Sequence, residues 1–396
     1  MRLSTLRDIK KLKGKRVLLR LDLNIPLDAR GRIEASGEAR LRAAIPTLKH
    51  LMKAGARVVI VSHLGRPAGH DKALSLAPVA RRLSVLMGAD MWFIPDAIED
   101  SDKIEKRLAK MNDGEAAMLE NIRFTKGEDS DNIFLARRLA SFADIFVNEA
   151  FSACHRASAS IVGVARLLPS YAGLQLEREV AALSKVIDKP KKPLVVMLGG
   201  AKVSGKIHVI EQMVKIADKV LIGGAMANAF LKAKGFHVGK SLVSITDVKL
   251  AKKLLKKTNI LLPTDVLTSR SLKGDIEPHV RQNIDVHKDD FIVDIGTETA
   301  RRWAGILKEA KTLVWNGPVG LFEVKQFSHG SVALGRVLAA RSSGKAYGVV
   351  GGGETVECLE RTGMAEFVDH VSTGGGAMLD FLAGKKLPGL VRLLKK

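Results

Sequence analysis

The sequence predicts an α/β protein with two doubly wound parallel-sheet domains, Rossmann-like in type and joined by a helix. Three observations support this prediction. The chain has 396 residues, more than the roughly 250–300 at which one hydrophobic core stops growing. Short apolar runs rich in β-branched residues alternate with segments of helical spacing. Two prolines flank two lysines at 190–193, and this break divides the chain near its middle.

The apolar runs are expected to form strands, and the helical segments between them imply parallel pairing with right-handed crossovers. In the first half the expected strands are 16–23, 56–62, 115–119 and 143–147. In the second half they are 193–198, 219–224, 259–263, 291–296, 312–317 and 345–353.

Helical spacing is clearest in two segments. Residues 38–55 place Leu41, Ile45, Leu48 and Met52 on one stripe, and residues 203–218 do the same with Ile207, Ile210, Val214 and Ala217. An amphipathic helix at 174–188 precedes the double-proline break and is expected to link the domains. A last helix is expected at 375–384.

Composition narrows the class of protein without deciding its function. Hydrophobic residues make up 46% and charged residues 27%, as in globular proteins. The net charge of +22 favours anionic ligands, whether nucleic acid, acidic lipid or small phosphorylated molecules. The basic run at 10–16 has no interleaved aromatic residues, so we interpret it as a solvated turn rather than a nucleic-acid platform.

Cysteine usage and hydropathy favour a cytoplasmic protein. Cys154 and Cys358 lie far apart and match no metal-ligand spacing, which suits a reducing compartment. No secretory signal is recognised near the first residues, and no run of 18 apolar residues suggests a membrane span.

Glycine clusters follow the expected strands of the second half. They lie at 198–200, 222–224, 315–320, 351–353 and 372–377. Glycines at the carboxyl ends of parallel strands let backbone N–H groups approach a phosphate closely. One such cluster would be an ordinary turn, but five in one domain favour a nucleotide or phosphate site.

One of these clusters begins the segment LGGAKVSGKI at 198–207, which is nearly a P-loop. Ile207 stands where a serine or threonine would ligate magnesium, so a true P-loop is excluded. Lys202 and Lys206 are four residues apart, and a helix starting near 202 would place both on one face as a phosphate clamp. The alternative is that both are solvated surface lysines.

Arginines and histidines concentrate near strand ends and turns in the first half. They are Arg20 (with Asp22), Arg40, His63, Arg66, Arg123, His155 and Arg156. Converging guanidinium groups would suit a small polyanion, because each can bind carboxylate or phosphate through two hydrogen bonds. A single arginine is usually a surface residue, and His63 alone would more often be a structural histidine.

Taken in order, these segments resemble phosphoglycerate kinase. The matching segments are 20–26, 62–67, 119–124, 199–207, 315–323, 351–355 and 372–377, and the resemblance extends over 16–390. It implies a two-domain kinase that closes about a hinge and transfers a phosphoryl group reversibly from 1,3-bisphosphoglycerate to ADP, with Mg²⁺. The implied parts are an N-terminal substrate domain (1–173), a hinge helix (174–190), a nucleotide domain (191–374) and a segment returning to the first domain (375–396).

The resemblance also implies roles for individual residues. Those that would hold 3-phosphoglycerate are Asp22, Leu23, Asn24, Arg40, His63, Leu64, Gly65, Arg66, Arg123 and Arg156. Those that would hold ATP or ADP are Lys206, Gly223, Gly224, Asn316, Pro318, Glu323, Gly352, Gly353, Glu354 and Thr355. Arg40, Lys202 and Gly375 would surround the transferring phosphoryl group. Glu354 would meet Mg²⁺, at a position where the family usually has aspartate.

Two other functions are weaker alternatives. A polyanion-binding protein would use the same net charge of +22 without catalysis. A dinucleotide-dependent dehydrogenase would need a G-x-G-x-x-G loop after the first strand, and 20–32 contain none. We therefore expect a monomer that acts on small molecules, with no specific nucleic-acid partner and no membrane attachment.

Overall fold

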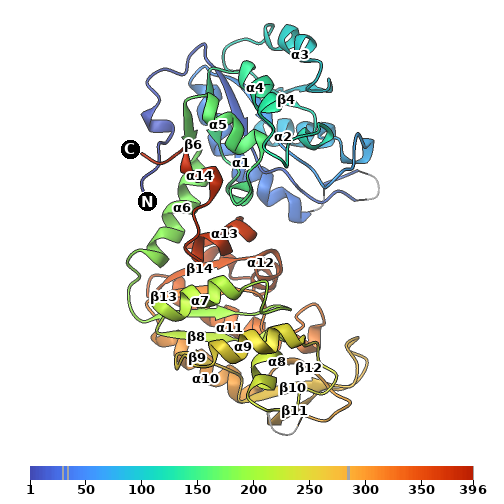
Figure 1. Ribbon diagram of the computed structural model, residues 1–396, viewed down its shortest axis with the longest axis vertical. Coiled ribbons are helices and arrows are strands. Elements are labelled where there is room, and N and C mark those ends of the chain that lie inside the picture. The colour runs from blue at the N-terminus through green and yellow to red at the C-terminus, as the bar shows by residue number, and fades with distance from the viewer. Residues whose placement is uncertain (29–30, 34, 283–285, 396) are drawn as a thin grey trace. The chain divides into compact units, whose positions relative to one another are not determined.

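The computed structural model describes residues 1–28, 31–33, 35–282 and 286–395 (Figure 1). The chain divides into two compact units. Unit 1 comprises Met1–Ala181 and Lys386–Lys396, and unit 2 comprises Ala182–Lys385. Each unit contains a six-stranded, all-parallel sheet with helices, so the predicted fold class is confirmed. The unit boundary falls within the expected linker helix, and 375–385 belong to unit 2.

The sheet of unit 1 has the strand order β3-β4-β2-β1-β5-β6. Its strands are β1 (Arg16–Arg20), β2 (Arg57–Val61), β3 (Trp92–Ile94), β4 (Ala116–Leu119), β5 (Ile145–Asn148) and β6 (Ser170–Ala172). All four strands expected in this half are present. The two edge strands, β3 and β6, were not predicted, and each has three residues of which only the last is buried.

Helices cover the sheet of unit 1. They are α1 (Ala35–Lys53), α2 (Ala77–Met87), α3 (Ser101–Leu108), α4 (Ile133–Ser141), α5 (Val164–Leu167) and α14 (Pro388–Val391). The helix α6 (Leu174–Ile187) begins in unit 1 and ends in unit 2. Val17 and Leu19 of β1 pack in one cluster with α1 and α2, whereas Leu18 packs in another with α3 and α4. This alternation shows that both faces of the sheet are buried, as expected for parallel strands.

The main sheet of unit 2 has the order β15-β14-β13-β7-β8-β9. Its strands are β7 (Leu194–Leu198), β8 (Lys219–Ile222), β9 (Ile260–Leu261), β13 (Thr312–Asn316), β14 (Tyr347–Gly351) and β15 (His370–Ser372). Its helices are α7 (Ile207–Ile216), α8 (Gly224–Ala233), α9 (Ile245–Leu254), α10 (Thr297–Glu309), α11 (His329–Ser342), α12 (Gly353–Glu360) and α13 (Gly376–Leu382). Trp303, Trp315 and Leu338 anchor the main core of this unit. The expected final helix corresponds to α13, but α14 follows it.

Unit 2 also contains a small antiparallel sheet that the sequence did not predict. It consists of β11 (His279–Gln282), β10 (Asp265–Ser269) and β12 (Phe291–Ile295). The prediction that 291–296 belong to a parallel sheet is therefore wrong. No helix separates these three strands within the described residues, so the parallel crossover that the prediction assumed is not formed.

Short helical turns complete the two units. Those of unit 1 are Leu6–Asp8, Lys72–Leu74, η3 (Ile122–Phe124), Phe151–Ala153 and Ala159–Gly163, and those of unit 2 are Lys325–Phe327 and Ala365–Phe367. No helix among the described residues has both the length and the apolar composition needed to cross a bilayer.

Candidate functional site

In unit 1, four neighbouring parallel strands bring the predicted residues to one edge of the sheet. Asp22 and Asn24 follow β1, and His63 and Arg66 follow β2. Arg123 lies in η3 after β4, and Arg156 lies beyond β5. Because β4, β2, β1 and β5 are adjacent and parallel, their carboxyl ends meet. The topology therefore gathers residues that are up to 134 positions apart, from Asp22 to Arg156.

Hydrogen bonds hold several of these side chains in place. Arg40 Nη1 donates to Asp22 Oδ2 at 2.6 Å, and the Ser152 hydroxyl donates to the same oxygen. Asn24 Oδ1 accepts the Gly65 N–H at 2.8 Å. On the other side of the Gly65 peptide, Arg123 Nη1 donates to its carbonyl oxygen at 2.6 Å. The turn after β2 is thus fixed on both sides by predicted site residues.

The side chain of His63 lies close enough to four arginine side chains to be affected by their positive charges. Its ring is buried, with Arg20 Nη2 3.0 Å from Nδ1. Burial lowers its pKa to about 2, with further contributions from the charges of Arg20, Arg123, Arg156 and Arg40. Four arginines that are remote in sequence therefore act on one imidazole.

A hollow of about 720 Å³ adjoins this cluster and is lined by Arg66, Arg123 and Arg156, among other residues. Arg66 and Arg156 are exposed, so their guanidinium groups can meet a ligand. Two other predicted site residues, Leu23 and Leu64, have buried side chains. The backbone N–H of Leu64 donates to Asn121 Oδ1 at 3.2 Å and is therefore already used.

In unit 2, the turns after β7, β8 and β13 pack backbone against backbone. The Gly200 N–H donates to the Pro318 carbonyl at 3.1 Å. Gly224 has a φ of +63°, and a Cβ added there would lie 2.7 Å from Gly200 N. Only glycine fits this junction, where the glycine clusters of the sequence meet.

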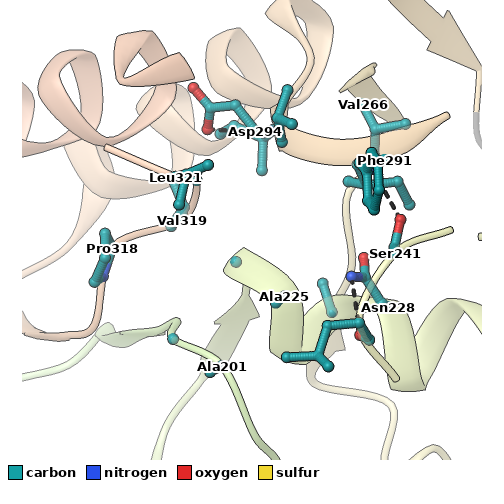
Figure 2. A pocket seen from close by; sticks show the side chains of 18 of the residues that line it. Ala201, Ala225, Asn228, Ser241, Val266, Phe291, Asp294, Pro318, Val319 and Leu321 are labelled. Carbon is teal, nitrogen blue, oxygen red and sulfur yellow. Dashed lines mark hydrogen bonds between the residues drawn. The ribbon is translucent and has the colours of Figure 1, made fainter. Parts of the chain in front are cut away.

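These turns form one side of a cavity of about 500 Å³ (Figure 2). Ala201 and Ala225 lie on one wall, Val266 and Phe291 on another, and Pro318 and Leu321 on a third. The cavity is mainly apolar and is also lined by Glu323 and Glu354, which are exposed. Its volume and mainly apolar lining suit a small organic ligand with an apolar ring and polar groups attached. The predicted residues that line it are Gly224, Pro318, Glu323 and Glu354.

Lys206 and Lys202 do not share a helical face, so that part of the prediction is wrong. Residues 204–206 form a turn, and α7 begins only at Ile207. Lys206 Nζ donates to the carbonyl oxygens of Gly199, at 2.7 Å, and Asn316, at 3.0 Å. Burial lowers the pKa of Lys206 to about 8. Lys202 is exposed instead.

Two further predicted residues, Asn316 and Thr355, hold the turns together. Asn316 Nδ2 donates to the Gly351 carbonyl at 2.7 Å, and Thr355 Oγ1 accepts the Gly317 N–H at 2.6 Å. Both side chains are buried. Their contacts join the end of β13 to the end of β14 and to the start of α12, so their observed contribution is to the shape of the site.

Glycine occupies the N-cap positions of α8, α12 and α13. These residues are Gly223, Gly352 (φ +98°) and Gly375 (φ +50°). Glycine brings no side chain to cover the first N–H groups, whereas α4 and α9 are capped by Asn132 and Ser244. Gly353 and Glu354 follow in the first turn of α12, where a phosphate would benefit from the helix dipole.

The described residues are compatible with a Mg²⁺ ion that takes most of its ligands from the phosphates of a nucleotide and from water. Among the described residues, no three His, Cys, Asp or Glu side chains gather closely enough to hold a metal ion. Glu354 supplies an exposed carboxylate at the cavity, in the first turn of α12. Mg²⁺ in kinases is often held by one or two carboxylates together with phosphate oxygens and water.

Sequence reasoning missed several residues that shape the two sites. Asp247 Oδ1 accepts the Ser204 N–H at 2.7 Å and so anchors the loop that contains Lys202 and Lys206. Asp294 lines the cavity, and burial raises its pKa to about 7. Both lie outside the glycine clusters. Only the apolar run at 291–296 indicated that a strand would contain Asp294.

A comparison with known protein families shows to which family the chain belongs. The family model described as phosphoglycerate kinase matches residues 6–385. The chain belongs to the phosphoglycerate kinase family. It is 45% identical to the phosphoglycerate kinase of Moorella thermoacetica over 99% of both chains. It is 42% identical to that of Thermosipho africanus over 99% of this chain and 98% of the relative.

Solved phosphoglycerate kinase structures share the whole fold. The enzyme from Coxiella burnetii superposes with a TM-score of 0.88 at 38% identity, covering 99% of both chains. The enzyme from Pyrococcus horikoshii gives a TM-score of 0.86 at 34% identity, covering 99% of this chain and 98% of that one. The similarity to phosphoglycerate kinases therefore spans both units.

Proposed function

We propose that the chain catalyses the Mg²⁺-dependent, reversible transfer of a phosphoryl group from 1,3-bisphosphoglycerate to ADP, giving 3-phosphoglycerate and ATP. The observation that carries the proposal is the presence of two complementary sites in one chain of this family. Unit 1 has an arginine-lined hollow, and unit 2 has an apolar cavity bordered by glycine turns and carboxylates.

In this proposal the hollow of unit 1 holds 3-phosphoglycerate. Arg66, Arg123 and Arg156 bind its phosphate and carboxylate through paired hydrogen bonds. Asp22 and Asn24 accept or direct hydrogen bonds from its hydroxyl group, and His63 donates to an anionic oxygen. The backbone of Leu23, Leu64 and Gly65 lines the approach, in keeping with the buried side chains of both leucines.

The cavity of unit 2 holds the adenosine portion of ATP or ADP. Gly223 and Gly224 border the base, and Glu323 accepts hydrogen bonds from the ribose. The phosphates lie at the N-terminus of α12, beside Gly352 and Gly353. The path to them is shaped by Asn316, Pro318 and Thr355. Lys206 meets the phosphates and exchanges a carbonyl contact for a charge-assisted hydrogen bond.

The reaction needs little from the protein beyond positioning and charge neutralisation. The attacking carboxylate of 3-phosphoglycerate is already ionised, so a general base is unnecessary. Arg40, Lys202 and the N–H groups near Gly375 stabilise the transferring group. Glu354 would hold Mg²⁺, and the ion would supply neutralisation of charge on the nucleotide phosphates. Direct transfer requires the two ligands to meet, so we propose that the units close during turnover, with the 174–190 helix as the hinge.

We also propose that the enzyme is a cytoplasmic monomer that acts on small molecules. The alternative of a specific polyanion-binding protein rests on the net charge of +22 alone. A gel-shift assay separates the two, because nonspecific attraction to nucleic acid disappears at physiological salt.

The decisive experiment is a coupled assay with purified protein, 3-phosphoglycerate, ATP and Mg²⁺. Production of ADP that depends on 3-phosphoglycerate is the expected result. The same assay with Mn²⁺ in place of Mg²⁺ tests the metal at Glu354. Absence of ADP production with a folded protein would refute the proposed reaction.

A further inference from the structure

We propose that the buried Arg20 is a positioning residue that fixes His63 as the Nε2–H tautomer, so that the neutral ring donates a hydrogen bond from Nε2 to an anionic oxygen of the substrate. The inference rests on the proposed function and deepens it. It concerns how one substrate-binding residue is prepared before the substrate arrives.

The geometry around Arg20 determines which ring nitrogen carries the proton. Arg20 is the last residue of β1 and is only 2% exposed. Its Nη2 lies 3.0 Å from His63 Nδ1, and its Nη1 donates to the Leu21 carbonyl. A guanidinium group has no acceptor, so Nδ1 must accept the hydrogen bond. A neutral imidazole whose Nδ1 accepts carries its proton on Nε2.

A second pair of buried residues fixes Arg20 itself. Arg20 Nε donates to Ser160 Oγ at 2.8 Å, and Ser160 Oγ donates to Glu128 Oε1 at 2.6 Å. Since a hydroxyl has one proton and Glu128 receives it, the oxygen of Ser160 is left to accept from Arg20. Glu128 also accepts the Ser160 N–H at 2.9 Å and lies 4.0 Å from Arg20 Nη2. Arg20 thus donates on two sides, to His63 on one and to Ser160 on the other, and Ser160 in turn donates to Glu128.

The surrounding charges keep the ring neutral. Arg20 on β1, Arg40 on α1, Arg123 in η3 and Arg156 after β5 all disfavour a proton on both nitrogens of His63, and Glu128 lies on the far side of Arg20. The pKa of about 2 agrees with the tautomer argument, although the hydrogen-bond geometry stands without it. The arginines supply the positive charge, while His63 supplies a directed donor.

The direct test is long-range ¹H–¹⁵N NMR on the full-length protein with ¹⁵N-labelled histidine, with His63→Gln used to assign the signal. The expected result is the Nε2–H pattern for His63, unchanged between pH 6 and pH 8. An Nδ1–H pattern, or a shift of the signal to the imidazolium form in this range, would overturn the proposal. This readout does not depend on enzyme activity.

Arginine variants test whether Arg20 sets the tautomer. In Arg20→Met the Nε2–H pattern should give way to a mixture, whereas Arg20→Lys retains a cationic donor and should preserve it. Arg16→Met is the matched control, since Arg16 is also on β1 but pairs with Glu105. If a folded Arg20→Met keeps a pure Nε2–H signal, the positioning role is wrong. If that variant does not fold, the wild-type spectrum still decides the tautomer.

Histidine variants test the use of Nε2–H by the substrate. The side-chain amide of glutamine reaches the Nε2 position, whereas that of asparagine reaches only the Nδ1 position. His63→Asn should raise the KM for 3-phosphoglycerate by about 10–100-fold, because the hydrogen bond from the Nε2 position to the anion is lost. His63→Gln should raise this KM much less, because glutamine keeps that hydrogen bond. The KM for ATP should not change. Equal effects of both variants would overturn the donor role, and a folded wild-type protein without turnover would instead overturn the proposed reaction.

Discussion

Arg40 and Lys206 are both cations at the proposed sites, but different surroundings hold them. The Arg40 side chain is 36% exposed and pairs with Asp22 at 2.6 Å. Lys206 is largely buried between two carbonyl oxygens, and burial lowers its pKa to about 8. An arginine keeps its charge in either setting, whereas a buried lysine titrates near neutral pH. The two residues therefore give different experimental signatures.

Arg40→Ala should lower kcat by about 10²–10³-fold, because one charge-stabilising donor to the transferring group is lost. The KM for ATP should change little, since the nucleotide site lies in unit 2. Steady-state kinetics measure both constants. The control is Arg42→Ala, which removes an exposed arginine of the same helix that pairs with Glu38. Unchanged turnover in Arg40→Ala would contradict the role proposed for this residue.

The affinity for MgATP should fall about tenfold between pH 7 and pH 9. Above its pKa of about 8, Lys206 is increasingly neutral in the free protein and must take up a proton to pair with phosphate. Isothermal titration calorimetry across this range measures the effect. Lys206→Met should abolish the pH dependence, whereas Lys202→Met should leave it in place. If the affinity of Lys206→Met for MgATP still falls between pH 7 and pH 9, another titrating group causes the pH dependence.

Residue types in the candidate site were predictable, but their contacts were not. The arginines before and after turns were visible in the sequence, and the topology brings Arg40, Arg123 and Arg156 to one imidazole. The pairing of Arg20 with His63 spans 43 positions and joins two strands, so no local spacing could indicate it. The prediction that Lys202 and Lys206 share a helical face was wrong for a local reason, because Lys206 is the N-cap of α7 and lies in a turn.

The start of α6 shows how an element can be fixed by residues remote in sequence. Its N-cap position is Gly173, which has no side chain, and Glu149 after β5 takes over the capping. Glu149 accepts the N–H groups of Gln175 at 3.0 Å and Leu176 at 3.1 Å. It also accepts from the hydroxyl of Thr47 on α1. A Cβ at Gly173 would lie 2.1 Å from the Glu149 carboxylate, so both residues are required together.

Glu149→Ala should destabilise unit 1 by about 2–4 kcal/mol, because buried N–H groups lose their acceptor. Urea denaturation followed by circular dichroism measures the change. Glu309→Ala, at the exposed end of α10, is the control and should stay within about 0.5 kcal/mol of the wild type. A loss below about 1 kcal/mol in Glu149→Ala would show that the α6 start is held by other contacts.

At the scale of elements, the apolar runs were predictable, including the run that contains the two-residue β9, whereas the five-residue β10 and the remaining short strands were not. The central strands β1, β2, β7 and β13 are five residues each and mostly buried, which gives a clear pattern. The edge strands β3, β6 and β15 have three residues each. β11 is mostly exposed and polar, so it resembles a loop in the sequence. Its pairing with β10 depends on partners that periodicity does not identify.

The whole molecule depends on a C-terminal segment that returns to unit 1. Leu387, Leu390 and Leu393 are buried there, and the Ser4 N–H donates to the Leu393 carbonyl at 2.7 Å. Leu3 and Leu394 form an antiparallel bridge, so the two ends of the chain lie side by side (Figure 1). Unit 1 is thus completed by residues from both ends of the sequence.

Leu393→Ala should destabilise the protein by about 2–5 kcal/mol, because a fully buried side chain leaves a cavity. Leu394→Ala is a matched control at the next position, where the leucine is 40% exposed, and should cost less than about 1 kcal/mol. Thermal denaturation with and without 3-phosphoglycerate measures both. Equal losses of stability in Leu393→Ala and Leu394→Ala would contradict the inference that the C-terminal segment completes the core of unit 1.

The arrangement of the chain ends has a consequence for biosynthesis. Unit 2 is continuous in sequence, so all of its residues are synthesised before residues 386–396. Synthesis of unit 1 begins first, yet this unit lacks the buried leucines of 386–396 until unit 2 has been synthesised. The unit whose synthesis begins first is therefore the unit that is completed last, and a nascent chain stalled before residue 386 would expose an incomplete first unit to chaperones.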